Sequence, residues 1–189
     1  MTTFEQQIKN VFGVSNTEMT VIQSFFKPKV LQKGDYFIKS GQTSGNLGFL
    51  QKGMLREFVV VGDKEITKWI STEGSFVVDL KSFVFKEPAR WNMQALTYVE
   101  LLVLQTSDYH KLTDAIPHWP EIEKMFIAKC FTIIEERVLQ HLSLTADERY
   151  NQLFAYNKHL FNQVPLQYFA SMLGMTPETL SRIRRKSSS

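Results

Sequence analysis

Glycines interrupt the middle of the chain at short intervals, and this spacing restricts the possible folds more than any other feature of the sequence. Between residues 29 and 104, β-rich segments alternate with turns about seven to twelve residues apart. The turns fall at Gly34, Gly41, Gly53, Gly62 and Gly74. Short strands separated at such intervals are typical of an antiparallel barrel or sandwich. We therefore expect an all-β domain in the first half of the chain, flanked by short helices before residue 27.

A long helix is expected directly after this domain. Residues 121–144 contain no helix breaker, and Pro120 is suited to the first helical position. A helix of about 22 residues would be about 33 Å long. Its apolar residues form more than one stripe, so it must pack against more than one neighbour. Periodicity alone leaves open whether that neighbour is a second copy of the chain or the rest of the same chain.

The window "LQYFASMLGMTPETLSRIRR", residues 166–185, has the pattern of two short helices that share a small core. Ala170 is small where the helices approach, and Gly174 can adopt the left-handed conformation that ends the first helix. Thr176 is suited to the N-cap and Pro177 to the first turn of the second helix. The apolar positions are Phe169, Leu173, Met175, Leu180 and Ile183. Together these features predict a helix-turn-helix.

The second of these helices has a polar face that suits a DNA major groove. Glu178, Ser181, Arg182 and Arg185 lie at i, i+3, i+4 and i+7, opposite Leu180 and Ile183. Arg182 can pair with guanine and Glu178 can accept from cytosine. The phosphate contacts are expected from Arg184, Arg185 and Lys186. The alternative is an ordinary ion pair between Glu178 and Arg182 on a solvated helix.

The charge distribution agrees with an anionic partner at this end. The chain has a formal net charge of +3. Residues 137–189 contain seven Lys and Arg against three Asp and Glu, and four of the seven lie between residues 182 and 186. Such a basic segment is typical of nucleic-acid binding, although an incidental basic tail on a ligand-binding or scaffold module remains the alternative.

The segment "PLQYFASMLGMTPETLSRIRRK" resembles the helix-turn-helix of the Crp/Fnr family of bacterial transcription regulators, and the order of elements upstream is also similar. The resemblance implies an α+β protein with an N-terminal β-roll like that of cyclic-nucleotide-binding domains. A long dimerisation helix and a winged-helix-like C-terminal domain would follow. We expect the sensor domain at residues 1–117, the helix at 118–142 and the DNA-binding domain at 143–189. Because the chain ends soon after the recognition helix, any wing is expected near residues 156–164.

The resemblance also implies partners and contact residues. The expected partners are a palindromic DNA operator, a second copy of the chain, RNA polymerase and a small-molecule effector. In the family the long helix forms the dimer interface, here expected at Ile122, Met125, Phe126, Ile133 and Val138. The family's base-contacting glutamate and arginine correspond to Glu178 and Arg182. Thr176, Ser181 and the basic residues that follow complete the expected DNA contacts. The arginine that often precedes that glutamate is Pro177 here, which removes one contact.

The effector pocket departs from the family pattern. Nucleotide binders in the family carry Gly-Glu-Leu and, after a short helix, Arg-Ser/Thr-Ala. The segment "GSFVVDL" retains Gly74 but has Ser75 in place of the glutamate, and Ala89, Arg90 and Trp91 occupy the second motif. Arg90 could still reach an anion or instead form an ion pair with Glu87. Since Trp91 would crowd the pocket and polar contacts are missing, we expect no cyclic-AMP cofactor.

Other functions lack the residues that they need. The four histidines have no metal-ligand spacing, so we expect neither metal nor haem. A cupin-type enzyme would need clustered histidines, and residues 29–104 contain none. No nucleophile and base are recognisable, so we expect no enzyme. The sequence has no apolar run of about 20 residues and no secretory signal, which predicts a cytoplasmic protein that does not enter membranes.

Overall fold

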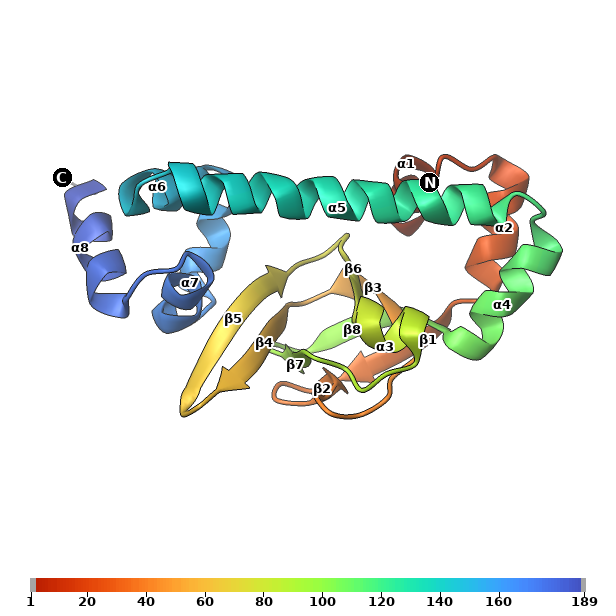
Figure 1. Cartoon of the computed structure of the whole chain (residues 1–189), viewed down its shortest axis with the longest axis horizontal. Helices are drawn as coiled ribbons and strands as arrows, with labels where there is room; N and C mark the ends of the chain where they lie inside the picture. Colours follow the sequence, from red (N-terminus) through yellow and green to blue (C-terminus); the bar gives the residue numbers. More distant parts are fainter. Residues whose placement is uncertain (1–2, 188–189) are drawn as a thin grey trace.

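The computed structural model describes residues 3–187, and of residues 156–159 and 187 it describes the backbone alone. Its longest element is helix α5 (Trp119–Ser143), which runs across the molecule over a β-roll (Figure 1). Helices α1 (Thr3–Phe12), α2 (Asn16–Ser24) and α4 (Thr106–Ala115) lie at one end of α5. The other end carries α6 (Ala146–Asn157), a 3-10 helix (Lys158–Asn162), α7 (Leu166–Met172) and α8 (Pro177–Ser187).

The β-roll consists of two four-stranded antiparallel sheets, ordered β1-β8-β3-β6 and β2-β7-β4-β5. Each sheet contains strands from both ends of the domain, as in a jelly roll. The predicted all-β domain at residues 29–104 is thereby confirmed. The strands are β1 (Lys27–Leu31), β2 (Tyr36–Ile38), β3 (Asn46–Lys52), β4 (Leu55–Val61), β5 (Lys64–Ser71), β6 (Phe76–Val78), β7 (Asn92–Ala95) and β8 (Val99–Gln105).

Strand β8 is apolar on both faces because it is covered on both. Val99, Leu101 and Val103 point into the interior of the roll, where they pack with residues of both sheets. Leu102 and Leu104 alternate with them and face the helices. The sheet β1-β8-β3-β6 therefore separates two cores, one inside the roll and one beneath α1, α4 and α5.

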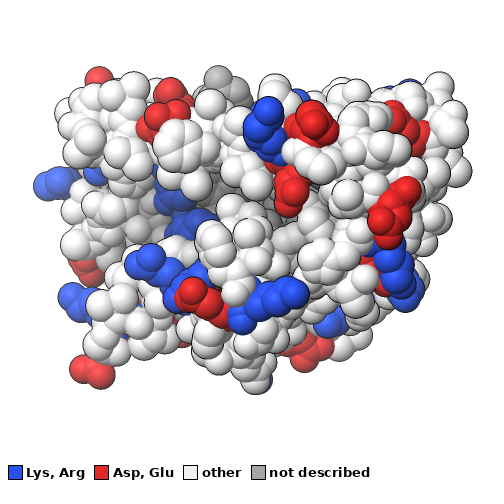
Figure 2. Space-filling view, turned by 45° about the vertical axis from the view of Figure 1, so that its right-hand side comes forward, with Lys and Arg blue, Asp and Glu red and all other residues white. Residues whose placement is uncertain are grey.

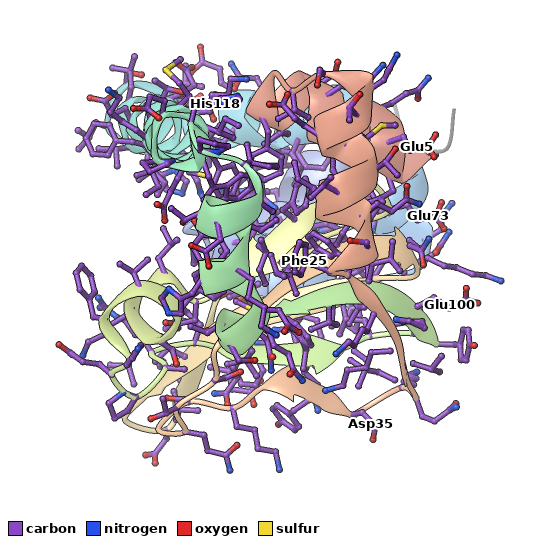
Figure 3. All side chains as sticks on the ribbon, turned by 90° about the vertical axis from the view of Figure 1, so that its right-hand side faces the viewer. Glu5, Phe25, Asp35, Glu73, Glu100 and His118 are labelled. Atoms are coloured by element: carbon purple, nitrogen blue, oxygen red, sulfur yellow. The ribbon has the colours of Figure 1, made fainter. Side chains whose placement is uncertain are left out.

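Aromatic rings fill the core between this sheet and the helices. Phe4 of α1 contacts Phe49 of β3 with ring centroids 4.8 Å apart, and Phe49 contacts Phe76 at 5.1 Å. Figure 3 looks along α5 from the end of His118 and shows α1 and α2 beside it, with side chains filling the space between the helices and the sheet. Lys129 of α5 also donates to the carbonyls of Asn10 and Val11 at the end of α1, so α1 fixes α5 to the roll.

The helices differ from the sequence prediction in three details. Helix α5 has 25 residues and begins at Trp119, so Pro120 is not its first residue. Helix α3 (Leu80–Phe85), not predicted, interrupts the β segments after Val78, and Asp79 caps it by accepting from the amide of Ser82. The expected wing is also wrong. Residues 158–162 form the 3-10 helix, and in the described part of the chain no strand follows Gln105.

The aromatic core supports a prediction about stability. Phe49 is 1% exposed, whereas Phe85 at the end of α3 is 70% exposed. Phe49→Ala should cost about 3–5 kcal/mol because it removes a ring from a closed core. At this chain length that corresponds to a melting temperature lowered by about 10 °C. Phe85→Ala, the same substitution at an exposed site, should change it by no more than about 1 °C. Equal shifts in thermal denaturation would contradict this account of the core.

Candidate nucleic-acid interface and effector pocket

The helices at the C-terminal end begin with a capping box. Thr145 and Glu148 bond to each other reciprocally: the Thr145 amide donates to the Glu148 carboxylate at 2.8 Å, and the Glu148 amide donates to Oγ1 of Thr145. The hydrogen bond from the Thr145 amide is the main reason why the pKa of Glu148 lies below its usual value. Helix α6 therefore begins at Ala146 with a capped first turn.

Helices α7 and α8 are joined by a tight turn at Gly174. Gly174 has φ +67°, a left-handed conformation that favours glycine, and the amide of Met175 donates back to the carbonyl of Ala170 at 2.9 Å. Thr176 then accepts from the amide of Thr179, as an N-cap does. Both the predicted end of the first helix and the predicted cap of the second are confirmed.

One face of α8 is buried and the opposite face is exposed. Leu180 and Ile183 lie in a core with Phe169, Ala170 and Leu173, as the sequence predicts. On the other side Glu178, Arg182 and Arg185 are exposed, and Ser181 is half-buried. Within residues 3–187 no ion pair joins Glu178 to Arg182. Glu178 accepts instead from its own amide and from Thr176, which holds its pKa below the usual value.

The basic residues after Ile183 are not equivalent. Arg184 is half-buried, and its guanidinium lies over the ring of Phe161 at 5.9 Å. Lys186 is exposed and lies 3.9 Å from Asp147 of α6. Elsewhere, on the face of the molecule in Figure 2, basic and acidic side chains are interspersed. The last turn of α8, with three basic residues and no acidic one, has a different character.

Asp79, and not Ser75, directly precedes the short helix α3, which differs from the expectation that Ser75 occupies the position of the family's glutamate. Gly74 and Ser75 form the turn before β6, where the amide of Gly74 donates to the Leu50 carbonyl. Asp79 directly precedes α3, the short helix that follows the acidic residue in the family motif, and "VDL" is the segment that corresponds to Gly-Glu-Leu.

The Asp79 carboxylate is fully buried and fully bonded. It is 1% exposed and accepts from three backbone amides. Oδ1 accepts from Ser82, and Oδ2 accepts from Arg90 at 2.9 Å and from Trp91 at 3.1 Å. The Asp79 carboxylate thus already accepts from amides in the first turn of α3 and in the second motif, at Arg90 and Trp91. The sequence signal that was available is an aspartate immediately before the helix.

The residues of the second motif, Ala89 to Trp91, are held by packing in the roll and by cationic side chains. Ala89 is buried in the interior of the roll. Arg90 is exposed and does not pair with Glu87, which bonds to Lys81 at 2.9 Å, so that expectation is corrected. Trp91 is half-buried, with Lys68 over its ring at 5.0 Å and Arg90 at 5.4 Å. Lys68 in turn bonds to Glu57. These side chains cover the segment.

Helix α5 presents its apolar residues in two directions, which corrects part of the expected dimer interface. Ile122 is buried in the core of its own chain, and Phe126 packs there against Phe12. Of the other expected residues, Met125, Ile133 and Val138 are exposed. The structure adds an exposed stripe at i, i+4, i+7, i+11 and i+15, which we call the α5 stripe: Ile127, Phe131, Ile134, Val138 and Leu142.

Across residues 3–187, no three His, Cys, Asp or Glu side chains are grouped so that they could hold a metal ion. The side chain of His159 lies outside the described residues. No helix in that range combines the length and the apolar character needed to cross a membrane.

One class of fold is defined by this order of elements: a β-roll, a long helix and a compact helical unit. Comparisons with known proteins agree with this class. Residues 28–115 match the family model of the cyclic nucleotide-binding domain. No curated protein matches the chain in sequence. Residues 28–115 are therefore similar to cyclic nucleotide-binding domains, and the chain is Crp/Fnr-like in fold.

Solved structures of regulators show the same fold over most of the chain. The Thermus thermophilus catabolite activator protein is 22% identical, with a TM-score of 0.60 over 93% of this chain and 84% of its own. The c-di-GMP-responsive global regulator CLP of Xanthomonas campestris is 14% identical, with a TM-score of 0.67 over 92% of each chain. FixK2 of Bradyrhizobium japonicum is 15% identical, with a TM-score of 0.71 over 85% of this chain and 83% of its own.

The bonding of Asp79 predicts a stability effect at the pocket. Asp79→Ala would leave three buried amides without acceptors and should cost about 3 kcal/mol. Asp79→Asn retains one carbonyl oxygen and should cost about half as much. Chemical denaturation of both variants measures the difference. If Asp79→Ala were as stable as the unmodified chain, the carboxylate would not be the group that holds α3 to Arg90 and Trp91.

Proposed function

We propose that this chain is a sequence-specific DNA-binding transcription regulator of the Crp/Fnr type that acts as a homodimer. In this proposal α7 and α8 form a helix-turn-helix and α8 is the recognition helix. The observation that carries the proposal is the two-sided character of α8. Leu180 and Ile183 fix the helix, while Glu178, Arg182 and Arg185 are exposed on its other face at the end of the molecule (Figure 1).

The exposed face has the chemistry that base pairs in a major groove require. The Arg182 guanidinium can donate two parallel hydrogen bonds to guanine O6 and N7. Glu178 stays ionised, because its pKa is lowered, and can accept from cytosine N4. Arg185 and Lys186 are exposed and can contact phosphates, whereas Arg184 must leave the ring of Phe161 to do so. Specificity is therefore assigned to Glu178 and Arg182.

The α5 stripe supports assembly of two copies. Its five apolar residues are spaced by four, three, four and four positions, which keeps them on one side of the helix, where a second helix can pack. They are exposed in the single chain, where such a surface is costly. Pairing the stripes of two copies would bury them and place two α8 helices at the same face of the dimer. Two half-sites about 34 Å apart would then be bound together.

The effector, if the pocket takes one, is proposed to be something other than cyclic AMP. A cyclic phosphate needs amides and an arginine, and the amides of Arg90 and Trp91 already bond to Asp79. A ligand of different chemistry would act by preferring one arrangement of the two DNA-binding units over another.

Substitutions in α8 test the DNA-binding role. Arg182→Ala should lower affinity for the selected site about 10–100-fold, because one bidentate base contact is worth about 1–3 kcal/mol, and should relax base preference at one position. Lys186→Ala, a matched loss of charge, should weaken binding to all sequences alike and reduce the salt dependence. Fluorescence anisotropy with selected and random duplexes at several salt concentrations measures both effects.

The same experiment separates this function from the alternatives. A lack of saturable binding to any duplex at low salt would reject the regulator and favour a ligand-binding or scaffold module with an incidental basic tail. A uniform loss of affinity in Arg182→Ala, without a change in base preference, would reject the base-contacting role alone.

A charge placed in the α5 stripe tests the dimer. Phe131 is 59% exposed at the middle of the stripe. Phe131→Glu would set two buried carboxylates against each other and should raise the dimer dissociation constant at least about 100-fold. Phe85→Glu introduces the same charge at an exposed aromatic residue outside the stripe and should leave the dimer intact. Analytical ultracentrifugation gives the masses, and a dimeric Phe131→Glu variant would place the interface elsewhere.

A further inference from the structure

Helix α7 packs on the β-roll of its own chain, so the DNA-binding unit is not an independent body. Met54 and Ile70 of the roll belong to the same buried cluster as Phe169, Leu180 and Ile183. Figure 1 shows α7 beside strand β5. We call the contact region between β4, β5, α5 and α7 the dock. It comprises Arg56, Thr67, Lys68, Arg137, Tyr168, Ser171 and Met172.

Strand β5 is the edge of its sheet, and α7 uses that edge. The order β2-β7-β4-β5 leaves one side of β5 without a strand neighbour. On that side the amide of Thr67 donates to Oγ of Ser171 at 2.8 Å. Unpaired edge amides in proteins are normally covered or satisfied in some other way. Here the hydroxyl of Ser171, a residue of the proposed DNA-binding unit, accepts the hydrogen bond that the edge amide of Thr67 would otherwise give to a neighbouring strand.

Arg56 adds a second contact, and it is one of the most buried side chains in the protein. It is 1% exposed, although it is charged. Its guanidinium lies 3.6 Å from the ring centre of Tyr168 of α7 and donates to Thr67 and Glu65. A buried cation stacked on an aromatic ring fixes the position of that ring closely. Tyr168 is therefore held against β4 and β5.

Arg137 joins three elements at one guanidinium. It extends from α5 and donates to the carbonyl of Lys68 on β5 and, at 3.0 Å, to the carbonyl of Met172 at the end of α7. Its guanidinium also lies over the ring of Trp69 at 4.9 Å. Burial lowers the pKa of Arg137, and nearby Glu57 opposes that effect, so the cation keeps its charge. The planar guanidinium suits two carbonyl acceptors better than an ammonium does.

These contacts set the direction of α8 relative to α5. Helix α7 is fixed to β5 and α5, and α8 is fixed to α7 through their shared core. We propose that Arg137 is a positioning residue that fixes the distance between the two recognition helices of a dimer and thereby selects the spacing between half-sites. This inference rests on the proposed function, because it needs a dimer that binds DNA.

Affinity for duplexes with altered spacing between half-sites is a sensitive measure of how rigidly the recognition helices are held. One base pair more or less between half-sites moves them by about 3.4 Å and turns one relative to the other by about 35°. A rigidly held pair of recognition helices cannot follow such a change, whereas a loosely attached pair can. The dock therefore predicts a sharp preference for one spacing, which a weakened dock should lose.

The test compares duplexes that carry the same two selected half-sites with the central spacer unchanged, one base pair longer or one shorter. The unmodified chain should lose at least about tenfold in affinity for each altered spacer. Arg137→Gln should reduce this loss to less than about threefold while retaining the base preference that depends on Arg182. Arg137→Lys should lie between them. Lys33→Gln removes the same charge from an exposed turn and should behave as the unmodified chain.

A second variant guards against a folding defect in Arg137→Gln. Ser171→Ala removes only a hydroxyl and should speed hydrogen exchange at the Thr67 amide, with a smaller loosening of the spacer preference. If the unmodified chain binds no duplex, the proposed function fails and this inference fails with it. If it binds without a spacer preference, or if both folded variants keep that preference, the inference alone is overturned.

Discussion

Helix α5 can bury only one of its apolar faces within its own chain, and the arrangement of the rest of the molecule depends on this. Ile122 and Phe126 pack against α1 and the sheet, and Lys129 caps α1. This anchors the first half of the helix, and its second half continues over β5, where Arg137 donates to the carbonyl of Lys68 (Figure 1). The α5 stripe on the other side stays exposed in the single chain, and the distal end carries α6, α7 and α8.

Internal hydrogen bonds hold the segment that runs from α3 to β7. Three amides that converge on one point attract an anion, and in this chain Asp79 supplies it permanently. The loop of Arg90 and Trp91 is thus fixed to α3 without a ligand. The Trp91 ring lies beneath Lys68 and covers the same loop.

Local sequence patterns predicted the elements well, because turns, caps and periodicity are local properties. The glycine spacing located the roll, and Gly174 and Thr176 located the turn between α7 and α8. Asp79 was not predicted, because the glycine of the family motif was aligned with Gly74. The physical signal is instead the aspartate that caps α3. Periodicity showed that α5 has more than one apolar face but not which is covered, so the expected interface included Ile122, which is buried in its own chain. Arg56 was unpredictable, since its burial depends on Tyr168, far away in the sequence.

The position of the dock has a consequence for the order in which the protein can form during synthesis. Strands β4 and β5 leave the ribosome well before α7, and domains generally fold from the N-terminus onward. The surface that receives Tyr168 and Ser171 is therefore complete when α7 emerges. Because the cluster around Phe169 includes Met54 and Ile70, the last helices complete their core on a template that already exists. The roll thus acts as an intramolecular scaffold for the maturation of the C-terminal helices.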